Sequence, residues 1–84
     1  MKEFEKELNL FPNPTLHKLE VIADGFDQEI LLMVYDSFSR QMPVEIDEIN
    51  FGRWSIRTEN LSSGLYLLRL ADNKQQISRP FYKE

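Results

Sequence analysis

The side chains most suited to acid–base or nucleophilic chemistry are few in this chain and are not grouped. His17 is the only histidine and there is no cysteine, so a catalytic triad would need His17 to meet a serine and an acid through the fold. No nucleophile elbow accompanies any of the serines. A chain of 84 residues is also too small to build a sheltered pocket beside its core. We therefore predict no catalytic residues, no cofactor and a surface position for His17.

Three carboxylates occur close together, at Asp24, Asp27 and Glu29. Carboxylate oxygens are the ligands that calcium prefers, but the spacing here lacks the order of an EF-hand loop. A turn with solvated acidic side chains is the simpler interpretation, and a calcium site is the alternative. The sequence predicts no other metal site.

Trp54 is the only tryptophan, and Arg53 and Arg57 lie close to it in the sequence. An exposed indole flanked by arginines could form a face that binds carbohydrate. A buried indole would instead be a core aromatic with two exposed neighbours. We favour the core position and keep an adhesive or carbohydrate-binding module as the alternative function.

The charge is divided unevenly between the two halves of the chain. The formal net charge of −4 argues against general binding to nucleic acid, which needs a basic face. Residues 1–48 carry eleven acidic and four basic residues, whereas residues 49–84 carry three acidic and six basic residues. Lys74, Arg79 and Lys83 lie near the C-terminus. They are either solvated side chains that discourage pairing of strand edges or part of a recognition tail.

The length and the apolar runs indicate one small domain. No apolar run approaches the ~20 residues that cross a bilayer, and the N-terminus lacks the apolar stretch of a signal peptide. Residues 1–7 are too short and polar to hold a helix, so we interpret them as a linker or tag. Residues 8–84 form the domain.

Short apolar runs alternate with turn residues along this domain, which is the pattern of an all-β sandwich. Pro12 and Pro14 stop the first run, so we expect that strand at a sheet edge. The third run is apolar on both faces and predicts a central strand covered on two sides. In the fifth run we expect Ile49, Phe51, Trp54 and Ile56 to face inward, with Gly52 at a bulge or bend. The pattern predicts about seven strands, at residues 8–11, 16–23, 28–35, 40–44, 49–58, 65–70 and 76–82.

The segment from Leu61 to Leu70 reads LSSGLYLLRL and places a Leu-x-x-Gly-x-Tyr pattern at the start of an apolar strand. Gly64 permits a positive φ in the turn. A tyrosine just inside a strand after such a turn can donate its hydroxyl to a backbone carbonyl upstream, which is the tyrosine corner of Greek-key sandwiches. We predict that Tyr66 forms this corner in an immunoglobulin-like antiparallel sandwich with Greek-key connections.

Three motifs in order resemble the C-terminal sorting domains of cargo proteins of the type IX (Por) secretion system in Bacteroidetes-type bacteria. Leu10 to Pro14, with Pro12, Asn13 and Pro14, resembles the family's opening "YPNP". The segment with Tyr35, Asp36 and Arg40 resembles its "IYDxxGR" segment, although Ser39 stands where the family has glycine. Leu61 to Leu70 resembles its "LxxGxYxxxx" segment, and the last strand resembles its basic closing strand, here interrupted by Pro80. The resemblance covers residues 8–84.

The resemblance implies a secretion signal without enzymatic activity. Such a domain follows an N-terminal cargo domain on the same precursor through the periplasm to the outer membrane and cell surface. Its implied partners are the outer-membrane translocon and a sortase-like protease that removes it. Lys74, Arg79 and Lys83 are the candidate recognition residues, and docking or strand addition could read them. We also expect that isolated copies could form a homodimer through an open strand edge.

Two other functions make different demands on the fold. An adhesive or carbohydrate-binding module would need a solvent-facing Trp54 beside Phe51 or Phe26. A small hydrolase or metal-dependent enzyme would need His17 beside a serine or carboxylates in a cleft.

Overall fold

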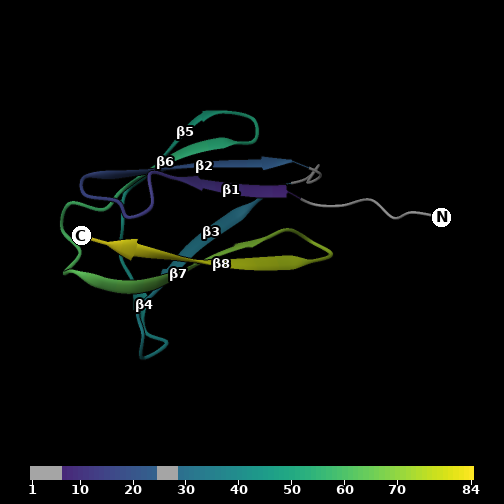
Figure 1. Cartoon of the computed structure of the whole chain (residues 1–84). Helices are drawn as coiled ribbons and strands as arrows, with labels where there is room; N and C mark the ends of the chain where they lie inside the picture. Colours follow the sequence, from purple (N-terminus) through teal and green to yellow (C-terminus); the bar gives the residue numbers. More distant parts are fainter. Residues whose placement is uncertain (1–6, 25–28) are drawn as a thin grey trace.

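The computed structural model describes residues 7–24 and 29–84, which form eight antiparallel strands in two stacked sheets (Figure 1). One sheet has the strand order β1-β2-β6-β5 and the other has the order β4-β3-β7-β8. The chain changes sheet after β2, β4 and β6, which confirms the predicted immunoglobulin-like sandwich. The strands are β1 (Glu7–Phe11), β2 (Lys18–Asp24), β3 (Leu31–Tyr35), β4 (Gln41–Met42), β5 (Ile46–Asn50), β6 (Arg53–Arg57), β7 (Gly64–Ala71) and β8 (Gln76–Lys83).

The core lies between the sheets and follows the alternation of the strands. Along β2 and β7 every second side chain is buried, because successive residues of a strand point to opposite faces. Each fully buried aliphatic side chain contributes about 1.5–3 kcal/mol relative to an exposed one. The fully or almost fully buried apolar side chains are Leu19, Val21, Val34, Ile56, Leu68, Leu70 and Phe81.

The predicted fifth strand is in fact a hairpin. Gly52 lies in the turn between β5 and β6 with φ at +86°, so the chain reverses where a bulge or bend was expected. This reversal gives eight strands rather than about seven. It also makes the inward orientation predicted for Ile49 and Phe51 wrong, since both side chains are exposed. Trp54 and Ile56 are buried, as predicted.

The third strand is central in its sheet, between β4 and β7, but it is not covered on both faces. Val34 is buried, whereas Leu31 on the opposite face is 61% exposed. The prediction of two covered faces is therefore wrong for β3, because no layer of the described chain packs on the outside of this sheet (Figure 1).

Strand β1 lies at the edge of its sheet, as the prolines that follow it predicted. The peptide bonds preceding Pro12 and Pro14 are both cis. The predicted linker or tag falls outside the described residues except for Glu7, which begins β1. The turn predicted around Asp24, Asp27 and Glu29 spans residues 25–28, so Asp27 and also Phe26 lie outside the described residues.

Candidate functional site

The Pro12–Pro14 motif contacts the end of the last strand, although the two are far apart in the sequence. The Asn13 Oδ1 accepts a hydrogen bond of 2.9 Å from the backbone N–H of Tyr82. The Thr15 N–H donates to the Tyr82 carbonyl, and the Glu84 N–H donates to the Thr15 carbonyl, both at 2.8 Å. We call these contacts between residues 13–15 and 82–84 the clasp. It ties the first sheet to the C-terminal end of β8.

Thr15 anchors the clasp in the core and was not singled out from the sequence. Its side chain is fully buried, and its Oγ1 donates to the Lys18 carbonyl at 2.6 Å. The same oxygen lies 3.2 Å from the Oγ1 of Thr58, which is also fully buried. A buried hydroxyl without a hydrogen-bond partner is unfavourable, so these two bonds should stay formed in the folded state. They fix the clasp to the start of β2 and to the residue after β6.

The tyrosine corner forms as predicted, next to the clasp. The Tyr66 hydroxyl donates to the Ser62 carbonyl at 2.7 Å, and Gly64 has φ at +151°. The Tyr66 ring stacks on Phe81 of β8, with ring centroids 5.6 Å apart. Gly64 is paired with Lys83 in the ladder between β7 and β8. The corner therefore fixes β8 from one side while the clasp fixes it from the other.

The third motif forms the turn between β3 and β4 and is organised by Asp36. Its Oδ1 accepts hydrogen bonds of 2.9 Å from the N–H groups of Phe38 and Arg40, and its Oδ2 lies 2.8 Å from the Arg40 Nε. These contacts, led by the backbone N–H of Arg40, lower the pKa of Asp36 below its usual value. Ser39 takes φ at +66°, a conformation that glycine adopts with less strain.

This turn also contacts the strand that begins at the tyrosine corner. The Ser37 Oγ donates to the Leu65 carbonyl at 3.1 Å, just after Gly64. The three sequence motifs and the C-terminus thus meet around the start of β7 and the end of β8.

The family model described as the secretion system C-terminal sorting domain matches residues 9–84, almost the whole chain. The chain belongs to this family. It is a C-terminal sorting signal for type IX secretion, and it directs a cargo protein that is part of the same precursor chain. The family is a secretion-signal family and not a catalytic one. No curated protein matches the chain closely enough to add a relative.

The three basic residues predicted for recognition are not brought together in the sorting domain. Lys74 is exposed in the turn between β7 and β8, where the Asp72 Oδ1 accepts hydrogen bonds from the N–H groups of Lys74 and Gln75. Arg79 is exposed in the middle of β8. Lys83, in contrast, is only 6% exposed and lies in the clasp, where its backbone forms a bridge with Thr15. Burial of Lys83 could not be foreseen from its position near the chain end.

The residues considered for other functions are not arranged for them. Trp54 is only 6% exposed, which confirms its position in the core, while the nearby Phe51 is 67% exposed. Arg57 lies within 4 Å of two acidic side chains, at 3.5 Å from Glu45 and 3.7 Å from Asp47. The sorting domain therefore lacks the solvent-facing Trp54 that an aromatic platform for carbohydrate would need.

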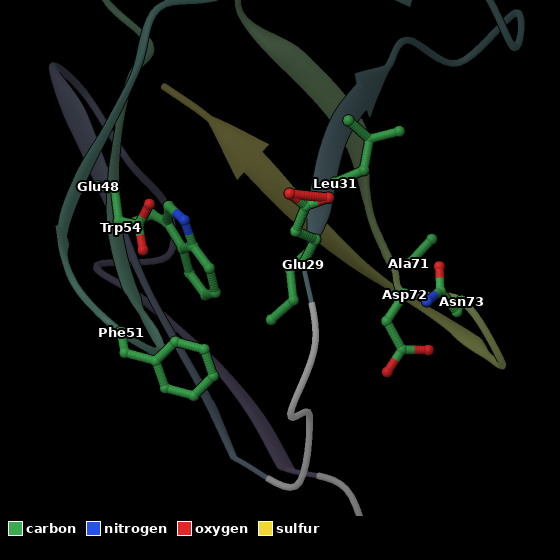
Figure 2. Close-up of a pocket in the computed structure, with 9 residues that line it drawn as sticks. Glu29, Leu31, Glu48, Phe51, Trp54, Ala71, Asp72 and Asn73 are labelled. Atoms are coloured by element: carbon green, nitrogen blue, oxygen red, sulfur yellow. The ribbon is translucent and has the colours of Figure 1, made fainter.

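A cleft of about 640 Å³ opens between the sheets beside Trp54 (Figure 2). Phe51 and Trp54 line one wall, and Leu31 and Asp72 lie across from them. His17 is exposed and is not among the lining residues. Within residues 7–24 and 29–84, no group of histidine and acidic side chains could hold a metal ion. The same residues include no helix that is long and apolar enough to cross a membrane.

Proposed function

We propose that the type IX machinery recognises this domain in its folded state, at the edge of the sandwich formed by the β7–β8 turn and β8. The observation that carries the proposal is the convergence of all three motifs on the ends of β7 and β8. The clasp and the tyrosine corner give this strand a fixed position. A strand held from both sides can present its exposed side chains in one geometry to a receptor.

The proposed route takes the precursor through the periplasm to the outer-membrane translocon. A sortase-like protease then removes the domain at or before residues 1–8, and the cargo is released or joined to an anionic lipopolysaccharide. Residues 1–6, ahead of β1, would serve as the linker in which the protease cuts. The match over residues 9–84 supports this route, because it leaves the linker outside the domain.

Docking is favoured over strand addition at the outer edge of β8. The backbone groups of Tyr82 point away from β7 and are bonded to Asn13 and Thr15. Pro80, two residues earlier, faces the same edge and has no N–H to donate. Only the first part of β8, near Gln76, keeps outward backbone groups for an added strand. The side chains are therefore the better recognition features.

Of the three basic residues predicted for recognition, Lys74 and Arg79 are the two that a receptor could reach, because both are exposed. Lys83 acts by a different route in this proposal: it holds the end of β8 between Gly64 and Thr15. A receptor that reads the two exposed charges would carry acidic groups, since opposite charges steer association.

The test is secretion of a reporter fused ahead of residues 8–84, in a bacterium that has the type IX machinery. We expect the wild-type fusion to reach the medium or the cell surface. The double variant Lys74→Glu/Arg79→Glu should reduce that fraction several-fold, with its melting temperature unchanged. The control Lys18→Glu/Arg53→Glu alters exposed charges on the other sheet and should be secreted normally.

A wild-type fusion that stays uncut in the periplasm refutes the function. Equal secretion of all three fusions would remove the role of Lys74 and Arg79.

Because the outer edge of β8 is largely closed, a homodimer through an open strand edge would have to use a strand other than β8. The remaining edges are β1 and β5 of the first sheet and β4 of the second, and β4 is only two residues long. The ladder of β5 is irregular between Glu48 and Asn50, which discourages pairing with a second copy. β1 is therefore the edge that we propose for dimers. Substituting Leu10 by proline should abolish any dimer seen by analytical ultracentrifugation if β1 is used.

A further inference from the structure

The two outer faces of the sandwich differ sharply in chemistry. On the β1-β2-β6-β5 sheet, the side chains that alternate with the buried ones are mostly polar or charged, which is the usual composition of a solvated sheet face. Examples are Asn9, Lys18, Glu20, Asp47, Arg53 and Arg57.

The outer face of the β4-β3-β7-β8 sheet is apolar instead. The strand register brings Tyr35 opposite Leu67 and Leu65 opposite Tyr82, and all four side chains alternate with core residues. Leu31 is 61% exposed, Leu65 is 53% exposed and Tyr82 is 47% exposed. Contiguous exposed apolar side chains of this kind mark interaction sites. We call this surface the apolar face; it comprises Leu31, Met33, Tyr35, Leu65, Leu67 and Tyr82.

One cation lies within the apolar face. Arg69 is opposite Met33 in the ladder, and its guanidinium carbon is 5.1 Å from the centre of the Tyr35 ring. The Arg69 Nε is buried and has no hydrogen-bond partner among the described residues. A buried donor without a partner is unfavourable, and a guanidinium is shaped to bind a carboxylate with two parallel hydrogen bonds. The outer positions of β3, β7 and β8 hold no acidic residue that could supply one.

We propose that the apolar face is the docking surface for a protein of the secretion machinery, and that this partner places a carboxylate on Arg69 within an apolar patch. The proposal rests on the proposed function and specifies which surface is read. Charge decides between occupants. A second copy would bring one Arg69-bearing face against another with no acid to pair. A polyanion such as a lipopolysaccharide or nucleic acid would need several cations in place of leucines.

Secretion of the reporter fusion tests the apolar face directly. Leu31 and Leu65 are the two most exposed apolar side chains of the face and lie at its two ends. We expect Leu31→Gln/Leu65→Gln to lower the secreted fraction by roughly tenfold, since a few side chains carry most of the binding energy of an interface. The control Leu16→Gln/Ile49→Gln removes two exposed apolar side chains elsewhere and should be secreted like the wild type. If both variants are secreted normally while the wild type still depends on the machinery, the proposed function stands and the docking surface is refuted.

Arg69 provides the variant that separates docking from folding. Arg69→Met keeps an apolar stem and removes the unpaired donor, so its melting temperature should equal or exceed that of the wild type. Its secreted fraction should nevertheless fall by several-fold, because the partner carboxylate loses its cation. Normal secretion of Arg69→Met would refute the carboxylate contact. In sedimentation equilibrium, a dimer that Leu31→Gln/Leu65→Gln abolishes would show that a second copy covers the face and would overturn the proposal.

Discussion

Single residues at the turns determine how this small sandwich closes. Asp36 receives two backbone N–H groups and one guanidinium, so one carboxylate organises the whole turn from β3 to β4. Ser39 completes that turn in a left-handed conformation, where the family motif has glycine. The departure at Ser39 was visible in the sequence, but only the structure shows that serine takes the glycine conformation. The left-handed conformation of Ser39 should therefore affect the stability of the domain.

Replacing Ser39 with glycine should stabilise the domain. A left-handed conformation costs a non-glycine residue about 1–2 kcal/mol, and glycine avoids this cost. Part of the gain is offset because a glycine gives the unfolded chain more conformational freedom, which is lost on folding. We expect a net gain of about 0.5–1 kcal/mol, or a few degrees in melting temperature, by thermal unfolding. Ser63→Gly is the control, because Ser63 has no positive φ and gains nothing from glycine. A decrease in stability for Ser39→Gly would contradict this reading of the turn.

The ionisation of Asp36 should appear in the dependence of stability on pH. Because its folded-state pKa lies below the unfolded value, the carboxylate stabilises the fold above the unfolded pKa. That contribution is lost as the pH falls through the lowered folded-state pKa. Urea midpoints measured from pH 7 to pH 2 should therefore decline less steeply for Asp36→Asn than for the wild type. Parallel declines would show that Asp36 does not contribute to the acid sensitivity.

Elements separated in the sequence are joined at the end of β8. The tyrosine corner was predictable because the glycine, the tyrosine and the accepting carbonyl lie within a few residues. The clasp was not predictable, since Asn13 and Tyr82 are 69 positions apart. The hairpin at Gly52 was missed for a related reason: the alternation from Ile49 to Ile56 resembles one continuous strand, and only a positive φ reverses it.

Removing the hydroxyl of Tyr66 should weaken the corner without disturbing the core. Tyr66→Phe keeps the stack on Phe81 and loses the hydrogen bond to the Ser62 carbonyl. We expect a loss of about 0.5–1.5 kcal/mol in the free energy of unfolding, measured by urea denaturation. Tyr82→Phe, at an exposed tyrosine, should change stability by less than about 0.5 kcal/mol. Equal effects of the two variants would deny the corner a special role.

Loss of the Asn13 side chain should open the clasp locally. Asn13→Ala leaves the Tyr82 N–H to water, and we expect a cost of about 1 kcal/mol. Hydrogen exchange should become faster at the amides of Tyr82 and Glu84, while the amides of β2 keep their protection. Asn9→Ala, on the outer face of β1, is the matched control and should leave exchange at Tyr82 unchanged. Unaltered exchange in Asn13→Ala would mean that Thr15 alone holds the strand.

The three sequence motifs predicted the fold class and the family of the domain, because each motif is a local turn signal. They did not predict which surfaces the fold would leave open. Lys83 was expected to be a candidate for recognition and is buried at the end of β8. Leu31 was expected to be covered and is exposed. Whether each of these side chains is buried or exposed depends on packing between strands that are distant in the chain. A local sequence pattern does not predict such packing.

As a sorting signal, residues 8–84 should direct a preceding protein through the type IX machinery. The most direct measurement is the fraction of a fused periplasmic reporter that reaches the medium or cell surface, in isogenic strains with and without the outer-membrane translocon. We predict export and removal of the domain in the first strain, and retention of the full-length fusion in the second. The same distribution in both strains, or retention in both, would show that residues 8–84 do not act as a type IX sorting signal.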